Sequence, residues 1–347
     1  MIIHSTSFKP IVETVKSSLI SKMTLSYEMV VPKNLAERAN KKNTTRLPVS
    51  LTIQLNKGSE FIDFSFTVDN RYVDSHRVCV LFNSDISSKF SYADQQFGII
   101  KRPVVREKEM LLWEKDQDKW NEKPISIEPC QSFVALEDKT HGVAVVPKGV
   151  REYEIVGDNY DSIRLTLFRT YGFMGKENLL YRPGRASGES VIETPDAQCH
   201  KKMSFDFSVV YYQGTLTEYR LAQKVNDYLK GISLYQYAEY LNTRLRFTQY
   251  DVEKYLPQSY SLFKLDSEAV LSLVNKSETR NGIILRLYNG KYNGSDTAKV
   301  LFTRPLKLAQ LINLKDESKS DLEFSSNEVF IPNIDHAKFI TLYVEFE

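Results

Sequence analysis

The feature that most constrains the fold is a succession of strand-length segments in which apolar and polar residues alternate. Residues 47–55 alternate in this way, the hairpin signal Asn56-Lys-Gly58 follows, and residues 61–68 alternate again. Successive side chains of a β-strand point to opposite faces, so this pattern predicts half-buried strands joined by tight turns. Because such segments follow one another without helical periods between them, the sequence predicts a mainly antiparallel β structure.

Further strands are predicted as far as residue 212. They are residues 18–32, 77–82, 132–136, 141–147, 153–156, 163–168 and 203–212. The segment 77–82 is continuously apolar, which is typical of a strand buried on both faces. So many strands in one stretch indicate a large antiparallel sandwich.

Helical signals occur at two places. Leu221, Val225 and Leu229 fall on one face of a predicted helix over residues 217–230, with Thr217 as its N-cap and Gly231 at its end. Residues 32–40 predict a helical turn or two, capped by Asn34.

The same patterns divide the chain into three parts. Residues 1–215 are predicted to form the large β-sandwich, and residues 216–260 a short helix followed by a tyrosine-rich linker. Residues 261–347 are predicted to form a smaller C-terminal β-sandwich, with strands at 269–275, 282–289, 298–302 and 339–346. The expected fold class is therefore all-β, a large antiparallel supersandwich followed by a smaller sandwich, with one short helix between them.

Composition limits the kinds of partner that the chain is expected to bind and the compartment in which it is expected to occur. The 46 basic and 44 acidic residues leave a formal charge of +2, which gives no field for binding nucleic acid. The N-terminus lacks the pattern of a secretory signal, and no uncharged run is long enough to span a membrane. The three widely spaced cysteines form neither a disulfide framework nor a zinc motif. The chain is expected to be cytoplasmic and to bind neither nucleic acid nor membrane.

Catalytic motifs are absent from the sequence. It contains no H-E-x-x-H, no His-x-Asp, no G-x-S-x-G elbow, no P-loop and no G-x-G-x-x-G. Asp74-Ser-His76 is the nearest approach to a metal motif, and turn composition favours a solvated turn over a metal site. The sequence therefore predicts no catalytic residue and no metal ligand in this chain.

One loop nevertheless has the residues of a ligand contact. The segment Tyr181-Arg-Pro-Gly-Arg-Ala-Ser-Gly188 follows a predicted strand and the turn at residues 171–175, so it is expected to hold two arginines and a tyrosine away from the sheet. Those arginines could instead pair with neighbouring acids such as Glu177 and Glu189, which would contribute only about 0–1 kcal/mol. Residues 93–98 leave a similar choice between a ligand contact and a simple hairpin bend.

Several segments resemble a known family. Residues 164–173, 180–188 and 194–198 resemble the C-terminal half of glycoside hydrolase family 38 α-mannosidases, in particular the bacterial branch that includes mannosylglycerate hydrolases. Residues 61–70, 93–98 and 286–289 fit the same resemblance, which covers nearly the whole chain. The block at residues 180–188 is the most specific part of it.

The resemblance implies a retaining, zinc-dependent hydrolase whose metal ligands and aspartate nucleophile lie in an N-terminal catalytic domain. The His-x-Asp zinc motif of that domain has no match in this sequence. The chain is therefore expected to lack the catalytic domain, to begin inside the large β domain and to be inactive alone. No cofactor is expected to bind this chain, and zinc is expected in the missing domain.

The resemblance also implies that loops of the large β domain offer side chains to the sugar. The matching positions are Arg169, Tyr181, Arg182 and Arg185, with Asp94 and Gln95 as weaker candidates. Arginine offers a fork of donors to hydroxyls or to a glycerate carboxylate, and tyrosine offers a ring face and a hydroxyl.

Three interpretations follow. The first is the C-terminal portion of an α-mannosidase acting on α-mannosides or mannosylglycerate, with the missing catalytic domain as its partner. The second is a free-standing carbohydrate-binding module, and the third is one chain of a split α-mannosidase. A degraded remnant would instead expose a sheet edge and be poorly soluble.

Overall fold

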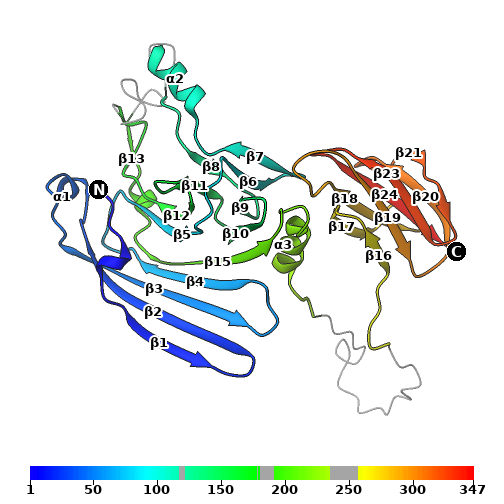
Figure 1. Ribbon diagram of the computed structural model, residues 1–347, viewed down its shortest axis with the longest axis horizontal. Helices are drawn as coiled ribbons and strands as arrows, with labels where there is room; N and C mark the ends of the chain where they lie inside the picture. The colour runs from blue at the N-terminus through cyan, green and yellow to red at the C-terminus, as the bar shows by residue number, and fades with distance from the viewer. Residues whose placement is uncertain (117–121, 178, 180–190, 235–256) are drawn as a thin grey trace. The chain divides into compact units, whose positions relative to one another are not determined.

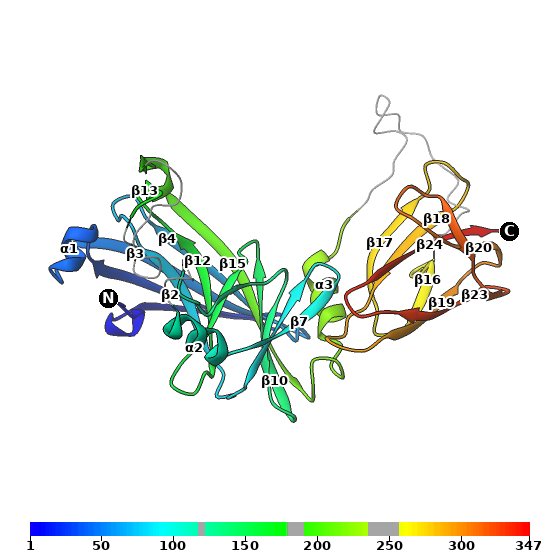
Figure 2. The ribbon, with the colours of Figure 1, turned by 90° about the horizontal axis from the view of Figure 1, so that it is seen from above.

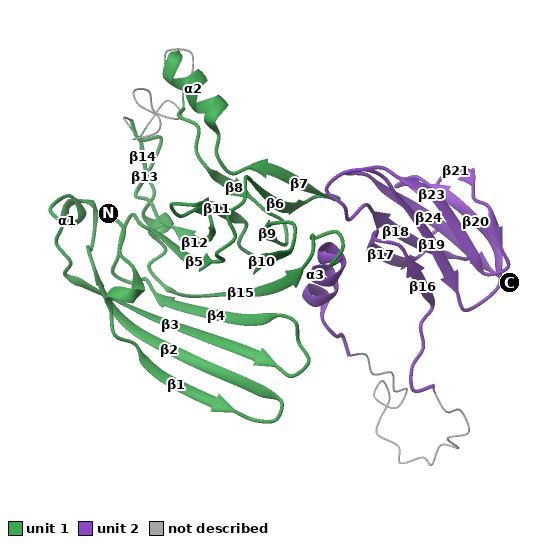
Figure 3. Ribbon diagram, viewed as in Figure 1, with its two compact units in different colours: residues 1–219 green, residues 220–347 purple. Residues whose placement is uncertain are grey.

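The computed structural model describes residues 1–116, 122–177, 179, 191–234 and 257–347. It divides into two compact units, residues 1–219 and residues 220–347 (Figure 3). Each unit has a buried hydrophobic cluster of its own.

The first unit is built on a nine-stranded antiparallel sheet within the described residues (Figure 1). In spatial order its strands are β1 (Ile11–Lys16), β2 (Ile20–Val31), β3 (Thr45–Asn56), β4 (Ile62–Asp69), β15 (Lys202–Gln213), β10 (His141–Lys148), β9 (Val134–Glu137), β6 (Phe90–Gln95) and β7 (Gly98–Pro103). The long strand β15 lies between β4 and β10, and its pairing with β4 joins residues more than a hundred positions apart in sequence, such as Asp69 and Lys202.

A second, four-stranded sheet covers part of the first. Its strands are β5 (Arg77–Asn83), β12 (Ser162–Arg169), β11 (Glu152–Val156) and β8 (Ile127–Pro129). The core lies between the two sheets, where Val145 and Phe207 of the first sheet share one buried cluster with Ile163 and Leu165 of the second. This is the arrangement of a β-sandwich, in which each sheet buries one face.

The burial of strand β5 differs from the prediction for residues 77–82. Its continuous apolar run predicted burial on both faces, but β5 is an edge strand that pairs only with β12 among the described strands. Val78, Val80 and Phe82 pack against the core, whereas Leu81 faces outward and remains 51% exposed. The prediction was wrong because an apolar run does not by itself indicate a second covering layer.

Two arms project from the strands of this unit (Figures 1 and 2). One contains helix α2 (Glu107–Lys115), and the other contains the two-stranded ribbon β13 (Phe173–Met174) and β14 (Ile192–Glu193). The short helix α1 (Leu35–Ala39) lies between β2 and β3, and Asn34 Oδ1 accepts the Glu37 N–H at 3.0 Å, as predicted for its N-cap. Single turns of 3-10 helix occur at η1 (Ser5–Ser7) and η3 (Pro195–Gln198).

The second unit is a smaller sandwich with a helix. Its sheets contain β16 (Phe263–Asp266), β19 (Asp296–Phe302), β23 (Glu328–Ile334) and β22 (Phe324–Ser325) in one layer, and β17 (Val270–Lys276), β18 (Ile283–Tyr288), β24 (Phe339–Phe346), β20 (Leu306–Ile312) and β21 (Ser318–Asp321) in the other. Leu285 and Leu342 of one sheet share a buried cluster with Val300 and Val329 of the other.

Helix α3 (Leu221–Lys230) belongs to this second unit. It begins after Arg220 rather than at the predicted cap Thr217, and it ends at Gly231, whose φ of 59° is easily adopted by glycine. Gln223 Nε2 donates to the carbonyls of Ser267 and Ala269, at 2.8 Å in each case, and so fixes the helix beside β17.

The all-β expectation is confirmed, because antiparallel sheets make up most of both units. The predicted tyrosine-rich linker lies mainly in residues 235–256, outside the described residues. Among the helices that are described, none has the length and apolar character needed to cross a bilayer.

Candidate functional site: a charged face beside Arg169

Arg169 is the last residue of β12, and its direction depends on a β-bulge. The pairing with β5 shifts between Thr166 and Phe168, so that Phe168 pairs with Val78 and packs against the core. The extra residue places Arg169 opposite Arg77, on the outer face of the four-stranded sheet. Without this bulge the strict alternation of the strand would turn Arg169 inward.

The Arg169 guanidinium is anchored but not enclosed. Its Nη2 donates to Glu152 Oε1 of β11, and the side chain remains 47% exposed. A guanidinium carries five N–H donors in a rigid fork. The outward donors of Arg169 can therefore bind a ligand while Glu152 holds the group in place.

Arg169 is part of a larger network on the same face. Arg77 lies 3.4 Å from Glu152 and 3.2 Å from Glu154, and its Nε donates to Thr166 Oγ1 at 2.8 Å. These groups meet because the register places Glu152 opposite Thr166, and Arg77 opposite Arg169.

Arg164 extends this network, with its Nε 3.7 Å from Glu154 Oε2. The register places Arg164 opposite Glu154 on the neighbouring strand. Three arginines and two glutamates give this face a formal charge of +1, which suits an anionic or hydroxyl-rich ligand. The sequence reasoning missed Arg77, Glu152 and Glu154, although the period-two spacing Glu152-Tyr-Glu154 and Arg164-Leu-Thr166 could have placed them on one face.

Backbone hydrogen bonds fix the base of the arm that follows Arg169. The Thr170 N–H donates to the His76 carbonyl at 2.8 Å, and the Thr194 N–H donates to the Gly172 carbonyl at 2.9 Å. Phe173 and Met174 then pair with Glu193 and Ile192. The candidates Tyr181, Arg182 and Arg185 fall between β13 and β14 in the sequence, outside the described residues.

Asp94 does not lie on the surface. It is 5% exposed, and its carboxylate accepts a hydrogen bond from Ser132 Oγ. Burial raises the pKa of Asp94 from 3.8 to about 6. The Gln131 N–H donates to the Asp94 carbonyl at 2.7 Å, so Asp94 joins β6 to the connection between β8 and β9.

Gln95, the neighbouring candidate, is also engaged locally. Its Nε2 donates to the Pro129 carbonyl at 2.9 Å. Asp94 and Gln95 belong to the nine-stranded sheet, whereas Arg169 belongs to the four-stranded sheet. Residues 93–98 form the bend of the hairpin between β6 and β7, which was one of the two interpretations of this segment.

The histidines do not gather into a metal centre in the described part of the chain, where no three ligand-type side chains are suitably grouped. His200 Nε2 lies 2.6 Å from Asp74 Oδ1, which is an ordinary surface pair. His76 packs edge-on against Phe168, and burial lowers the pKa of its imidazole to about 4. His76 is therefore part of the packing rather than of a solvated turn.

Comparisons with known proteins agree on one family. Residues 3–173 match the family described as "Glycosyl hydrolases family 38 C-terminal domain". A putative mannosylglycerate hydrolase of Halalkalibacterium halodurans is 26% identical over 264 residues, which cover 76% of this chain and 25% of that protein.

Two crystal structures from Enterococcus faecalis share the fold. One is an α-mannosidase, with a TM-score of 0.74 and 17% identity over 97% of this chain and 35% of that chain. The other is a protein of glycosyl hydrolase family 38, with a TM-score of 0.71 and 17% identity over 97% of this chain and 36% of that chain. The chain thus spans between a quarter and about a third of the length of these relatives.

Proposed function

The chain belongs to glycoside hydrolase family 38, of which it carries the C-terminal β region, and from this premise we propose that it works as the non-catalytic β portion of an α-mannosidase-type hydrolase. Its role is to present side chains to an α-mannoside or to a mannosylglycerate-type sugar. The metal and the nucleophile are supplied by a catalytic domain, either from the same gene or from a separate chain.

The observation that carries this proposal is the placement of Arg169. The bulge in β12 directs the guanidinium outward, and Glu152 fixes it at the base of the arm that leads to Tyr181, Arg182 and Arg185. A positioned guanidinium supports a contact with a hydroxyl-rich or carboxylate-bearing ligand, and the sequence adds two arginines and a tyrosine at residues 181–185.

Exposed apolar side chains on the two arms favour a polypeptide as the partner of this chain. Phe173, Met174 and Ile192 of the β13–β14 ribbon are between 43% and 54% exposed, and Leu111 of α2 is 65% exposed. Apolar side chains gathered on projecting segments are typical of surfaces that another polypeptide covers. We propose that the catalytic domain packs against these arms.

Cys79, Cys130 and Cys199 are unpaired, which is compatible with the cytoplasmic location that we also propose.

Replacing Arg169 by lysine tests the sugar contact. Lysine keeps the charge but loses the planar fork, so we expect mannosylglycerate to bind about tenfold more weakly, a loss of about 1.4 kcal/mol. Methyl α-mannoside, which lacks the carboxylate, should lose less. The measurement is an NMR titration up to millimolar ligand, in which backbone amide shifts give the affinity of the parent and of each variant, and the Arg169 side-chain Nε–H of the parent reports the contact itself.

Arg71→Lys is the matched control, because Arg71 is an exposed arginine of the same unit that pairs with Asp69. The sugar-contact proposal is wrong if the Arg169 signal does not move with either ligand, or if both lysine variants bind as the parent does. Micromolar affinity of the chain alone would instead favour the free-standing carbohydrate-binding module.

A further inference from the structure

A second polar surface lies on the opposite face of the nine-stranded sheet from the core. Register places Thr52, Ser65, Asp206 and Lys148 side by side on β3, β4, β15 and β10. The alternate residues Phe66 and Phe207 point into the core. The outer row is thus presented by four adjacent strands whose inner face packs on the core, which is a rigid support.

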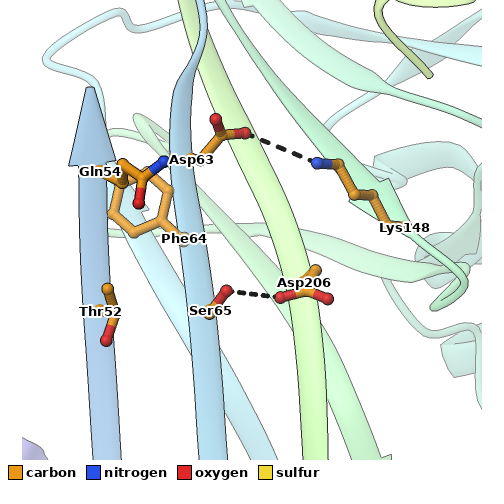
Figure 4. A pocket seen from close by; sticks show the side chains of 7 residues that line it. All are labelled: Thr52, Gln54, Asp63, Phe64, Ser65, Lys148 and Asp206. Carbon is orange, nitrogen blue, oxygen red and sulfur yellow. Dashed lines mark hydrogen bonds and ion pairs between the residues drawn. The ribbon is translucent and has the colours of Figure 1, made fainter. Parts of the chain in front are cut away.

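This surface is hollowed. A pocket of about 180 Å³ is lined by Thr52, Gln54, Asp63, Phe64, Ser65, Lys148 and Asp206 (Figure 4). Drug-sized ligands occupy pockets of about 300–1,000 Å³, so this one is suited to a smaller molecule of the size of a single sugar ring. The short side chains of Thr52 and Ser65 beside longer neighbours account for the hollow.

The carboxylates that border the pocket are held in position. Asp63 Oδ1 lies 3.5 Å from Lys148 Nζ and accepts a hydrogen bond from Ser208 Oγ at 2.9 Å. Asp206 Oδ1 accepts a hydrogen bond from Ser65 Oγ at 2.6 Å, and Asp206 Oδ2 accepts none from the described residues. An oriented carboxylate oxygen is therefore open at the rim of the pocket.

The charges select the chemistry of the ligand. Two carboxylates and one ammonium give the lining a formal charge of −1, which disfavours phosphate and carboxylate ligands. A neutral polyol matches the lining well, because its hydroxyls can donate to Asp206 and Asp63 and accept from Lys148. Hydrogen bonds to charged groups are roughly twice as strong as neutral ones.

We propose that this pocket binds one ring of a neutral sugar or a similar polyol, with Asp206 as the principal acceptor. The proposal goes beyond the function proposed above, because it uses none of the groups around Arg169.

The test is a titration of the full chain with methyl α-mannoside and, separately, with glycerol, followed by backbone amide NMR. Saturable shifts at Ser65, Lys148 and Asp206 at millimolar ligand are expected. Asp206→Asn should weaken this binding about tenfold, because asparagine lacks the charge. Thr67→Ala is the control, since Thr67 lies in the next row on the same face and bonds to Ser204 rather than to the pocket.

Additional variants and ligands distinguish this proposal from the Arg169 contact and from other causes of the shifts. Arg169→Lys should leave the shifts at the pocket unchanged, so failure of the Arg169 contact and failure of this proposal can be told apart. Circular dichroism checks that Asp206→Asn is folded. The proposal is overturned if no polyol shifts these amides, if Asp206→Asn binds as tightly as the parent, or if CaCl₂ produces the shifts and the polyols do not.

Discussion

Replacing Gly142 by alanine should destabilise the first unit by on the order of 3–5 kcal/mol. Gly142 lies in β10 between Glu137 of β9 and Tyr212 of β15. The Tyr212 ring crosses over the glycine, and its hydroxyl donates to Glu137 Oε2 at 3.0 Å. A Cβ on residue 142 would lie 2.2 Å from Tyr212 Cζ, so the ring must move. Overpacking and the loss of a buried hydrogen bond each cost about 1–3 kcal/mol.

The measurement is urea unfolding, supported by hydrogen exchange of the β10 amides. Tyr212→Ala provides the control, because it removes the ring that a methyl group at residue 142 would strike. In that background Gly142→Ala should cost little, and the two substitutions should show strong coupling. Equal losses from Gly142→Ala with and without the tyrosine would contradict this account of the packing.

Replacing Asp94 by asparagine should stabilise the first unit at pH 8, by up to about 3 kcal/mol. Burial raises the folded-state pKa of Asp94 from 3.8 to about 6, and a tenfold change in proton affinity corresponds to about 1.4 kcal/mol. Because the folded pKa is raised, the folded state binds more protons than the unfolded state between about pH 4 and 6. The contribution of this group to stability is therefore fully present below pH 4 and is lost as the pH rises through 6. Asparagine has no charge to bury, and its amide oxygen can still accept from Ser132.

The same urea experiment at pH 4, 6 and 8 checks the sign. Asp138→Asn is the opposite control, since hydrogen bonds from Thr140 lower the pKa of Asp138 to about 2. Asp138 contributes stability above pH 4 that is lost as the pH falls towards 2, so its replacement should destabilise at pH 8. If Asp94→Asn lowers stability at pH 8 by as much as Asp138→Asn does, the burial account of Asp94 is refuted.

Much of the fold could be predicted because local pattern and tertiary position agree. The alternation in residues 47–55 and 61–68 became β3 and β4, and residues 339–346 became β24 at the predicted bounds. Asn34 caps α1 because its side chain reaches the N–H of the residue three positions ahead, which is a purely local property.

Long-range features could not be predicted in the same way. The segment 77–82 is apolar throughout, yet only the sheet order reveals that β5 is an edge strand. The position of β15 beside β4 depends on pairing over more than a hundred residues, which no local pattern encodes.

The candidate site likewise contains features that the sequence could predict and features that only the tertiary structure reveals. The family resemblance selected Arg169, but its outward direction follows from the bulge in β12, which has no signature in the sequence. Asp94 was selected as a weaker candidate, and the structure buries it beside Ser132. The resemblance therefore identified candidate groups, whereas exposure and register decide which of them can meet a ligand.

Hydrolytic activity of the purified chain tests the central claim most directly. The chain should be assayed on an aryl α-mannoside and on mannosylglycerate, with added Zn²⁺ or Co²⁺, and a full-length family member should serve as the positive control. Our account predicts no turnover above the buffer rate with either substrate, because the metal and the nucleophile come from the catalytic domain. Turnover that co-purifies with the chain through successive columns would contradict it.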